Sequence, residues 1–147
     1  MKVVRLAERH REDWERLYAG YAAFYRVTQT AEMRATVWGW IHDPAHEVEA
    51  LVAEAESGRA IGLAHFRAFA RPLSATTGGF LDDLFVDPTL RGRRVADALI
   101  EAVAAVGRER GWSVIRWITA DDNYRARGVY DRLATRTMWI TYDKKPG

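Results

Sequence analysis

The feature that most constrains the fold is a strand-like run followed by a short turn and a basic helix start that contains glycine. Residues 80–86 (FLDDLFV) are predicted to form a strand, 87–90 (DPTL) a turn, and 91–96 (RGRRVA) the start of an amphipathic helix that ends before Gly111. The first amides of a helix lack intrahelical partners, and the helix dipole is positive there. Because arginines add full charge, this stretch predicts a phosphate-binding site.

The composition predicts one domain spanning residues 1–147. A chain with 48% hydrophobic and 29% charged residues is typical of soluble globular proteins. No cysteine is present, which excludes disulfides, thiolate metal sites and cysteine nucleophiles. We find no apolar run of membrane-spanning length, and residues 1–5 are not followed by a signal-peptide core, so we expect a cytoplasmic protein with no membrane partner.

The charge balance argues against nucleic acid as a partner. The chain has 22 Lys and Arg residues against 20 Asp and Glu residues, for a net charge of +2. Only the arginine cluster within 91–94 supports a nucleic-acid-binding domain, and such a domain would bind tightly and with a steep salt dependence. We therefore expect no nucleic acid among the partners.

The order of predicted elements indicates an α/β fold. Hydrophobic periodicity and turn residues predict helices at 11–25, 31–42, 91–110 and 124–133, and strands at 2–6, 49–54, 60–69, 80–86, 112–119 and 137–142. Thr30 is the expected N-cap of the second helix. The strand–helix–strand unit in the middle implies a parallel pair with a right-handed crossover. The expected architecture is a mixed antiparallel and parallel sheet flanked by helices.

Three pieces of the sequence together resemble the GNAT superfamily of acyl-CoA-dependent N-acetyltransferases. The strand 82–86 with Pro88 matches the family's fourth strand, and 91–96 stands where the family has an Arg/Gln-x-x-Gly-x-Gly/Ala signature. Downstream, an Asn…Ala…Leu-Tyr…Leu pattern is matched by Asn123, Ala126, Val129, Tyr130 and Leu133. One departure is Arg94, which replaces the middle glycine of the signature, whereas Gly92 and Ala96 remain.

The resemblance implies acetyl-CoA as co-substrate and no metal. In the family's arrangement, main-chain amides of the signature loop hold the pyrophosphate, the pantetheine arm pairs with the central strand, and the amide of Val86 polarises the thioester carbonyl. The implied coenzyme-binding residues are Leu84, Phe85, Val86, Arg91, Gly92, Arg93, Arg94, Val95, Ala96, Asn123 and Tyr130. Asn123 has a second reading as the cap of the last helix.

The implied reaction is acetyl transfer to a primary amine by direct attack in a ternary complex. An alkylammonium, with a pKa of about 10.4, must lose a proton before it can attack. Neighbouring strand residues face opposite sides, so one of the two acids faces the acceptor. Asp82 is the expected base, and Asp83 either holds the substrate or is buried and paired. Tyr130 stands at the family's general-acid position for the leaving thiolate; the alternative is that it only packs under the last helix.

The expected acceptor pocket is lined by aromatic residues and an acid. Such rings receive an ammonium group by cation–π contact. The candidate liners are Phe24, Tyr25, Trp38, Asp83 and Trp139. By resemblance the acceptor is a small amine, a polyamine or a lysine-type amine. The alternative function is a non-catalytic acyl-CoA-binding sensor or partner-binding module of the same fold. A homodimer that pairs through residues 138–140 is a further expectation by analogy with the family.

Overall fold

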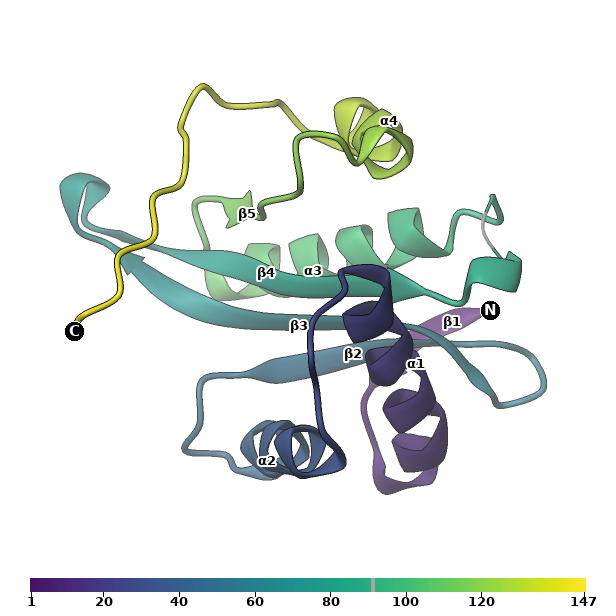
Figure 1. Ribbon diagram of the computed structural model, residues 1–147. Coiled ribbons are helices and arrows are strands. Elements are labelled where there is room, and N and C mark those ends of the chain that lie inside the picture. Colours follow the sequence, from purple (N-terminus) through teal and green to yellow (C-terminus); the bar gives the residue numbers. More distant parts are fainter. Residues whose placement is uncertain (91) are drawn as a thin grey trace.

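A single mixed sheet forms the centre of the molecule (Figure 1). The computed structural model describes residues 1–90 and 92–147. Within these residues the sheet has five strands in the order β1-β2-β3-β4-β5, antiparallel from β1 to β4 and parallel between β4 and β5. The strands are β1 (Lys2–Arg5), β2 (Glu49–Glu54), β3 (Ala60–Arg71), β4 (Thr76–Val86) and β5 (Ile115–Arg116). The expected mixed α/β sheet is confirmed.

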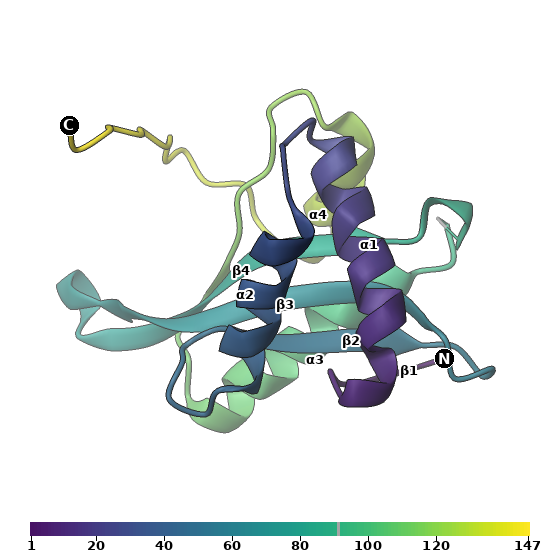
Figure 2. The same ribbon diagram turned by 60° about the horizontal axis from the view of Figure 1, so that its bottom comes forward.

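The helices cover both faces of this sheet (Figure 2). On one face lie α1 and α2; on the other lies α3, which makes the crossover between the parallel strands β4 and β5. The helix α4 packs its inner side against the same cluster as α3. The helices are α1 (Arg11–Phe24), α2 (Ala31–His42), α3 (Val95–Arg110) and α4 (Tyr124–Leu133), with short 3-10 turns η1 (Glu8–His10), η2 (Pro72–Ser74) and η3 (Pro88–Leu90). No described helix has the length and apolar character needed to cross a bilayer.

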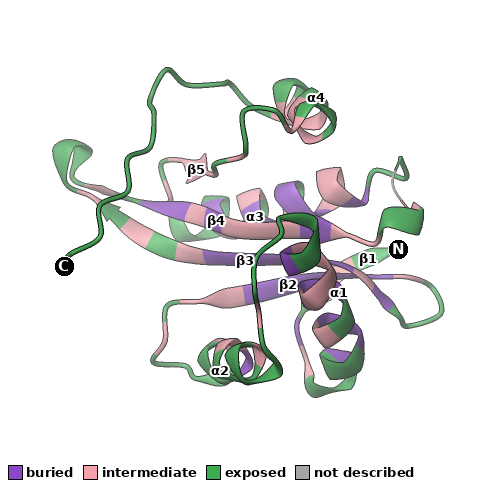
Figure 3. Ribbon diagram, in the orientation of Figure 1, coloured by how far each residue is buried: buried purple, intermediate pink, exposed green. Residues whose placement is uncertain are grey.

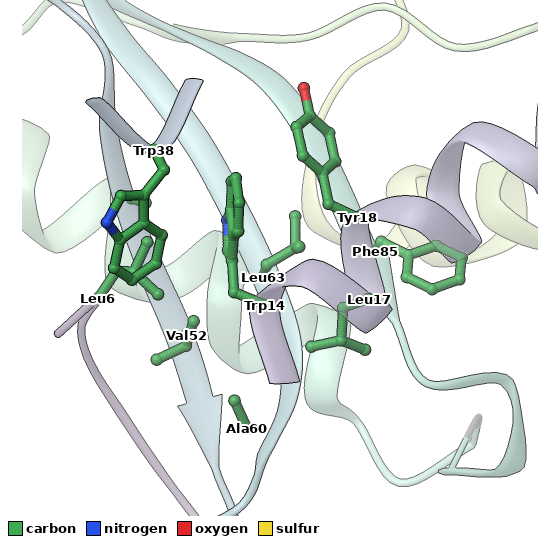
Figure 4. Close-up of a cluster of buried hydrophobic side chains, with 10 residues drawn as sticks. Leu6, Trp14, Leu17, Tyr18, Trp38, Val52, Ala60, Leu63 and Phe85 are labelled. Atoms are coloured by element: carbon green, nitrogen blue, oxygen red, sulfur yellow. The ribbon is translucent and has the colours of Figure 1, made fainter. Parts of the chain in front are cut away.

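Two clusters of apolar side chains fill the space between the sheet and the helices on its two faces. The first, under α1 and α2, centres on Trp14, which packs edge-on against Trp38 with ring centroids 5.2 Å apart (Figure 4). The second, under α3, contains Phe66 and Leu99, both fully buried. Burial is concentrated in the middle of the strands, and the C-terminal segment is exposed along its length (Figure 3).

The parallel strands β4 and β5 separate soon after they meet. Their pairing consists of Gly79 opposite Ile115 and Phe80 opposite Arg116. Gly79 permits the close approach at this point, because a Cβ atom there would lie 2.4 Å from the Trp112 ring. Beyond Phe80 the edge of β4 on this side has no strand partner among the described residues. Main-chain groups of the second half of β4 are therefore free to bind another extended chain.

A β-bulge interrupts the pairing of β3 with β4 where the two adjacent acids stand. His65 lies opposite Asp83 and Phe66 opposite Leu81, so Asp82 is the extra residue on β4. A bulge breaks strict alternation and redirects side chains locally. The prediction that Asp82 and Asp83 face opposite sides of the sheet is therefore wrong, and both lie beside the same pocket.

The end of the chain differs from the sequence-based expectation. The strand predicted at 137–142 does not form, and Trp139 is 85% exposed. The strand predicted at 112–119 is reduced to the two residues of β5. The segment 137–142 has high β-propensity, but propensity forms a strand only where a neighbouring strand and a packing surface exist. Pairing of residues 138–140 across a homodimer stays a prediction.

Asp13 on α1 fixes this helix to the start of β3. Its carboxylate accepts hydrogen bonds from Arg59 Nε and Nη2, the shortest at 2.6 Å, and from the Ala60 amide at 3.0 Å. The bonds from Arg59 hold the pKa of Asp13 below its ordinary value. A lowered folded-state pKa stabilises the fold above the unfolded-state pKa of about 3.9, and this stabilisation disappears as the pH falls through the folded-state value.

Replacing Asp13 by asparagine is therefore expected to destabilise the protein at neutral pH. We expect a loss of about 1–3 kcal/mol in the free energy of unfolding at pH 7, because the charged acceptor is removed. The loss should shrink toward zero as the pH falls through the lowered pKa of Asp13. Urea denaturation across this range measures both values. Glu12→Gln, an exposed neighbour, is the control and should change stability by less than about 0.5 kcal/mol. An equal loss at every pH would contradict the charge-based account.

Candidate active site

Two hollows lie side by side along β4. The first, which we call the β4–α4 cleft, has a volume of about 370 Å³, and the second, which we call the acid pocket, about 310 Å³. The cleft is lined by Phe24, Tyr25, Leu84, Phe85, Val86, Leu90, Gly92, Arg94, Val95, Ala96, Asp97, Asn123, Arg125, Ala126, Val129, Tyr130 and Arg132. The acid pocket is lined by Tyr18, Val37, Trp40, His46, Glu47, Val48, His65, Arg67, Asp82 and Asp83.

One end of the β4–α4 cleft is the N-terminus of α3. Gly92 has a φ of +86°, and Arg94, which caps the helix, has a φ of +57°. Both values lie in the left-handed region, which costs a residue with a side chain about 1–2 kcal/mol. The Arg94 side chain is 76% exposed and forms an ion pair with Asp97 at 3.7 Å. Arg93 is exposed and is not among the cleft residues, and Arg91 lies outside the described residues.

The other wall of the cleft is α4. Tyr130 packs edge-on against Trp117, with ring centroids 5.4 Å apart, and lines the cleft together with Asn123. The Asn123 amide donates to Thr119 Oγ1 at 3.2 Å and reaches the Tyr25 hydroxyl at 3.5 Å. Burial, with a smaller effect of Tyr25, raises the pKa of Tyr130 to about 12. Its phenol therefore stays protonated at neutral pH.

Asp82 stands at the bulge on the wall of the acid pocket. Its carboxylate accepts from Arg67 Nε at 3.1 and 3.3 Å. Burial raises the pKa of Asp82 above its ordinary value, the Arg67 charge opposes this, and the neighbouring Asp83 charge adds to it. A carboxylate with a raised pKa is a stronger base than a solvated one.

Asp83 is the more enclosed of the two acids. Its Oδ2 atom accepts from His65 Nδ1 at 2.8 Å and from the Tyr18 hydroxyl at 3.0 Å. Burial raises the pKa of Asp83, but the hydrogen bond from His65, the charge that His65 carries when it is protonated, and the hydrogen bond from Tyr18 together hold this pKa below its usual range. The pKa values of the two neighbouring acids are thus shifted in opposite directions, as is common at sites of acid–base chemistry.

The aromatic residues proposed from sequence as acceptor liners do not form one pocket. Phe24 and Tyr25 line the β4–α4 cleft instead of the acid pocket. Trp38 is 7% exposed and belongs to the core under α1 and α2. Trp139 is exposed because its predicted strand is absent. Of the proposed set, Asp83 alone lines the acid pocket.

The acid pocket has its own aromatic wall, which sequence reasoning missed. The rings of Trp40 and His46 stack with centroids 4.8 Å apart and an interplanar angle of 5°. The signal was the spacing of Val37 and Trp40, three residues apart and therefore on one helix face. His65 also lines this pocket and is almost fully buried.

Comparison with known proteins decides the family. The profile of the Acetyltransferase (GNAT) family matches residues 14–134, which is most of the chain. The chain belongs to the GNAT family of acetyltransferases. This confirms both the resemblance inferred from the signature loop and the expected class of enzyme, an acyltransferase.

Two curated relatives agree with that assignment, and a solved structure shares the fold of this GNAT chain. A D-amino-acid N-acetyltransferase of Saccharomyces cerevisiae is 28% identical over 134 residues, covering 90% of this chain and 83% of the relative. A thialysine N-epsilon-acetyltransferase of Bos taurus is 32% identical over 59 residues, covering 40% of this chain and 35% of the relative. The structure of an aminoglycoside N-acetyltransferase in complex with CoA shares the fold with a TM-score of 0.85 at 23% identity, covering 99% of this chain and 95% of that one.

Proposed function

We propose that this enzyme transfers an acetyl group from acetyl-CoA to a primary amine, by direct attack in a ternary complex. The observation that supports it most is that two consecutive residues of β4 belong to different hollows. Asp83 lines the acid pocket and Leu84 lines the β4–α4 cleft. A thioester in the cleft and an amine in the acid pocket would meet at this strand, which favours a direct transfer.

The β4–α4 cleft suits the coenzyme. It joins the N-terminus of α3, where amides are free to bind phosphate, to the edge of β4 that β5 leaves unpaired. Leu84, Phe85 and Val86 would pair with the pantetheine arm, and the Val86 amide would donate to the developing oxyanion. The related aminoglycoside enzyme was solved with CoA, which is consistent with this use of the fold.

The acid pocket suits an ammonium group. The named relatives act on a D-amino acid, thialysine and aminoglycosides, and these share an amine. Asp82 would take the proton from the ammonium, directly or through one water, because it is the acid with the raised pKa. Asp83 would contribute its negative charge. The identity of the amine within this class is open to the screen below.

Tyr130 would donate a hydrogen bond to the sulfur as the thiolate leaves. A phenol with a pKa of about 12 is a weaker acid than a thiol with a pKa of about 8.5, so full proton transfer from it is uphill. We propose that the tyrosine stabilises the departing thiolate by hydrogen bonding, and that solvent completes the protonation. This role differs from that of a general acid, which the family resemblance implies for Tyr130 and in which the phenol would give its proton to the thiolate.

The test is release of free thiol from acetyl-CoA with a panel of amines: D-amino acids, lysine and lysine peptides, polyamines, amino sugars and arylamines. Release with at least one class supports the proposal. If no amine causes thiol release while acetyl-CoA still raises the thermal unfolding temperature, the acyl-CoA sensor is favoured. Acetyl-CoA at 100 times its Kd should add about 2.7 kcal/mol to stability. If there is neither thiol release nor stabilisation by acetyl-CoA, we would conclude that Arg94 prevents coenzyme binding.

A further inference from the structure

A buried hydrogen-bond chain leads from the core to the acid pocket. The Trp14 indole N–H on α1 donates to His65 Nε2 at 2.9 Å, and His65 Nδ1 lies 2.8 Å from Asp83 Oδ2. Trp14 and His65 are 0% and 1% exposed. Both ring nitrogens of His65 are therefore used by protein partners, away from water.

This arrangement determines where the His65 proton lies. An indole N–H can only donate, so Nε2 must present a lone pair to it. The proton of the neutral ring is then on Nδ1, from which it is donated to Asp83. A proton on both nitrogens would set the Nε2–H against the indole N–H, two donors facing each other in a buried site. His65 is thus a neutral donor, and its bond to Asp83 is not a salt bridge.

We propose that Trp14 is a positioning residue, which keeps His65 in its neutral Nδ1–H form so that the charge of Asp83 remains uncompensated in the acid pocket. Tyr18, the other donor to Asp83 Oδ2, is neutral too, because burial raises the pKa of its phenol. Arg67 makes its hydrogen bonds to Asp82. The remaining negative charge favours an ammonium in the pocket and a proton on Asp82. This role in catalysis rests on the proposed acetyl transfer, whereas the state of His65 does not.

The charged and titratable groups around Asp83 come from four directions. They are Tyr18 and Tyr21 from α1, His65 and Arg67 from β3, Asp82 from β4, and His46 and Glu47 from the segment before β2. His46 is the second imidazole of the pocket; its Nδ1 accepts from the Val48 amide at 3.1 Å. It is present in every variant proposed below and is therefore common to each comparison with the wild type.

The decisive variant is Trp14→Phe, which removes the N–H and keeps an aromatic ring. His65 Nε2 is then free to take up a proton, and an imidazolium would neutralise Asp83 at acid pH. The ratio of kcat/KM for the amine, variant over wild type, should fall at least about threefold between pH 8.5 and pH 6, the range in which imidazoles titrate. Trp112→Phe is the matched control, since Trp112 packs under α3 and its indole makes no hydrogen bond with the described residues. Its ratio should stay flat.

A second substitution isolates the cause. In Trp14→Phe with His65→Asn, the asparagine amide can still donate to Asp83 but cannot become charged, so the fall in the ratio should disappear. A ratio for Trp14→Phe that does not change with pH would overturn the positioning role and leave Trp14 a packing residue. The folded fraction of each variant is measured at each pH by circular dichroism, and kcat/KM is expressed per folded protein, because stability itself changes with pH.

A measurement on the wild-type protein does not depend on the substrate and needs a variant only to assign the signals. Nitrogen-15 NMR of the histidine rings, with His65 assigned by the loss of its signals in His65→Asn, reports which nitrogen is protonated. We expect the ring proton on Nδ1 and none on Nε2 at pH 7. A doubly protonated ring at pH 7, or a proton on Nε2, would overturn the proposal. This outcome is separate from a failed amine screen, which would refute the acetyl transfer alone.

Discussion

Replacing Asp82 by asparagine is expected to lower kcat for acetyl transfer by about 10²- to 10⁴-fold, the usual contribution of a general base. Asparagine has nearly the same shape and can still contact Arg67, but it cannot take a proton from the ammonium. Affinity for acetyl-CoA should stay within about twofold, because Asp82 lines the acid pocket and not the β4–α4 cleft. Steady-state kinetics with the best amine, together with acetyl-CoA titration, measures both quantities.

The pH profile makes this prediction more specific. A base works only when it is deprotonated, so wild-type activity should fall as the pH drops through the raised pKa of Asp82. This acid limb should be absent in Asp82→Asn, which keeps only the limb that belongs to protonation of the amine. Asp121→Asn, an acid with a 94% exposed side chain, is the control and should behave as wild type. If Asp83→Asn abolished the limb and Asp82→Asn kept it, Asp83 would be the base instead.

The parts of this enzyme that the sequence predicts correctly are built from residues close to one another in the chain. The strand, turn and helix start between Phe80 and Ala96 lie close along the chain, and their polar and apolar spacing predicts the crossover from β4 through α3 to β5. The signature also marks the residue at 94 as special. The backbone gives the reason, since Arg94 adopts the left-handed conformation for which glycine is ordinarily used.

The parts that were not readable depend on partners far apart in the chain. Trp14 and His65 are 51 residues apart, and His65 lies opposite Asp83 only because β3 and β4 pair in one register. The bulge at Asp82 changes the direction of a side chain without any composition signal, so alternation gave the wrong face. For the strand predicted at 137–142 the error has the same origin, because a strand needs a neighbour that local sequence does not supply.

Replacing Tyr130 by phenylalanine is the second large effect that we expect. The ring would keep its contact with Trp117, so stability and acetyl-CoA affinity should change little, whereas kcat should fall by about 10²-fold through loss of the hydrogen bond to the departing thiolate. Tyr124→Phe, on the same helix but 73% exposed, is the matched control and should leave kcat unchanged. Rapid thiol-release assays with both variants measure the difference.

Changing the leaving group distinguishes two roles for Tyr130, stabilisation of the departing thiolate and packing. A selenol is a stronger acid than a thiol, so acetyl transfer from the selenium analogue of acetyl-CoA needs less help at the leaving atom. The loss caused by Tyr130→Phe should therefore shrink with the analogue, while the loss caused by Asp82→Asn should persist, because deprotonation of the amine does not depend on the donor. An equal loss with both donors would assign Tyr130 to packing or coenzyme binding. The phenol is a weaker acid than the thiol. We therefore expect the selenium analogue to reduce the loss caused by Tyr130→Phe but not to remove it.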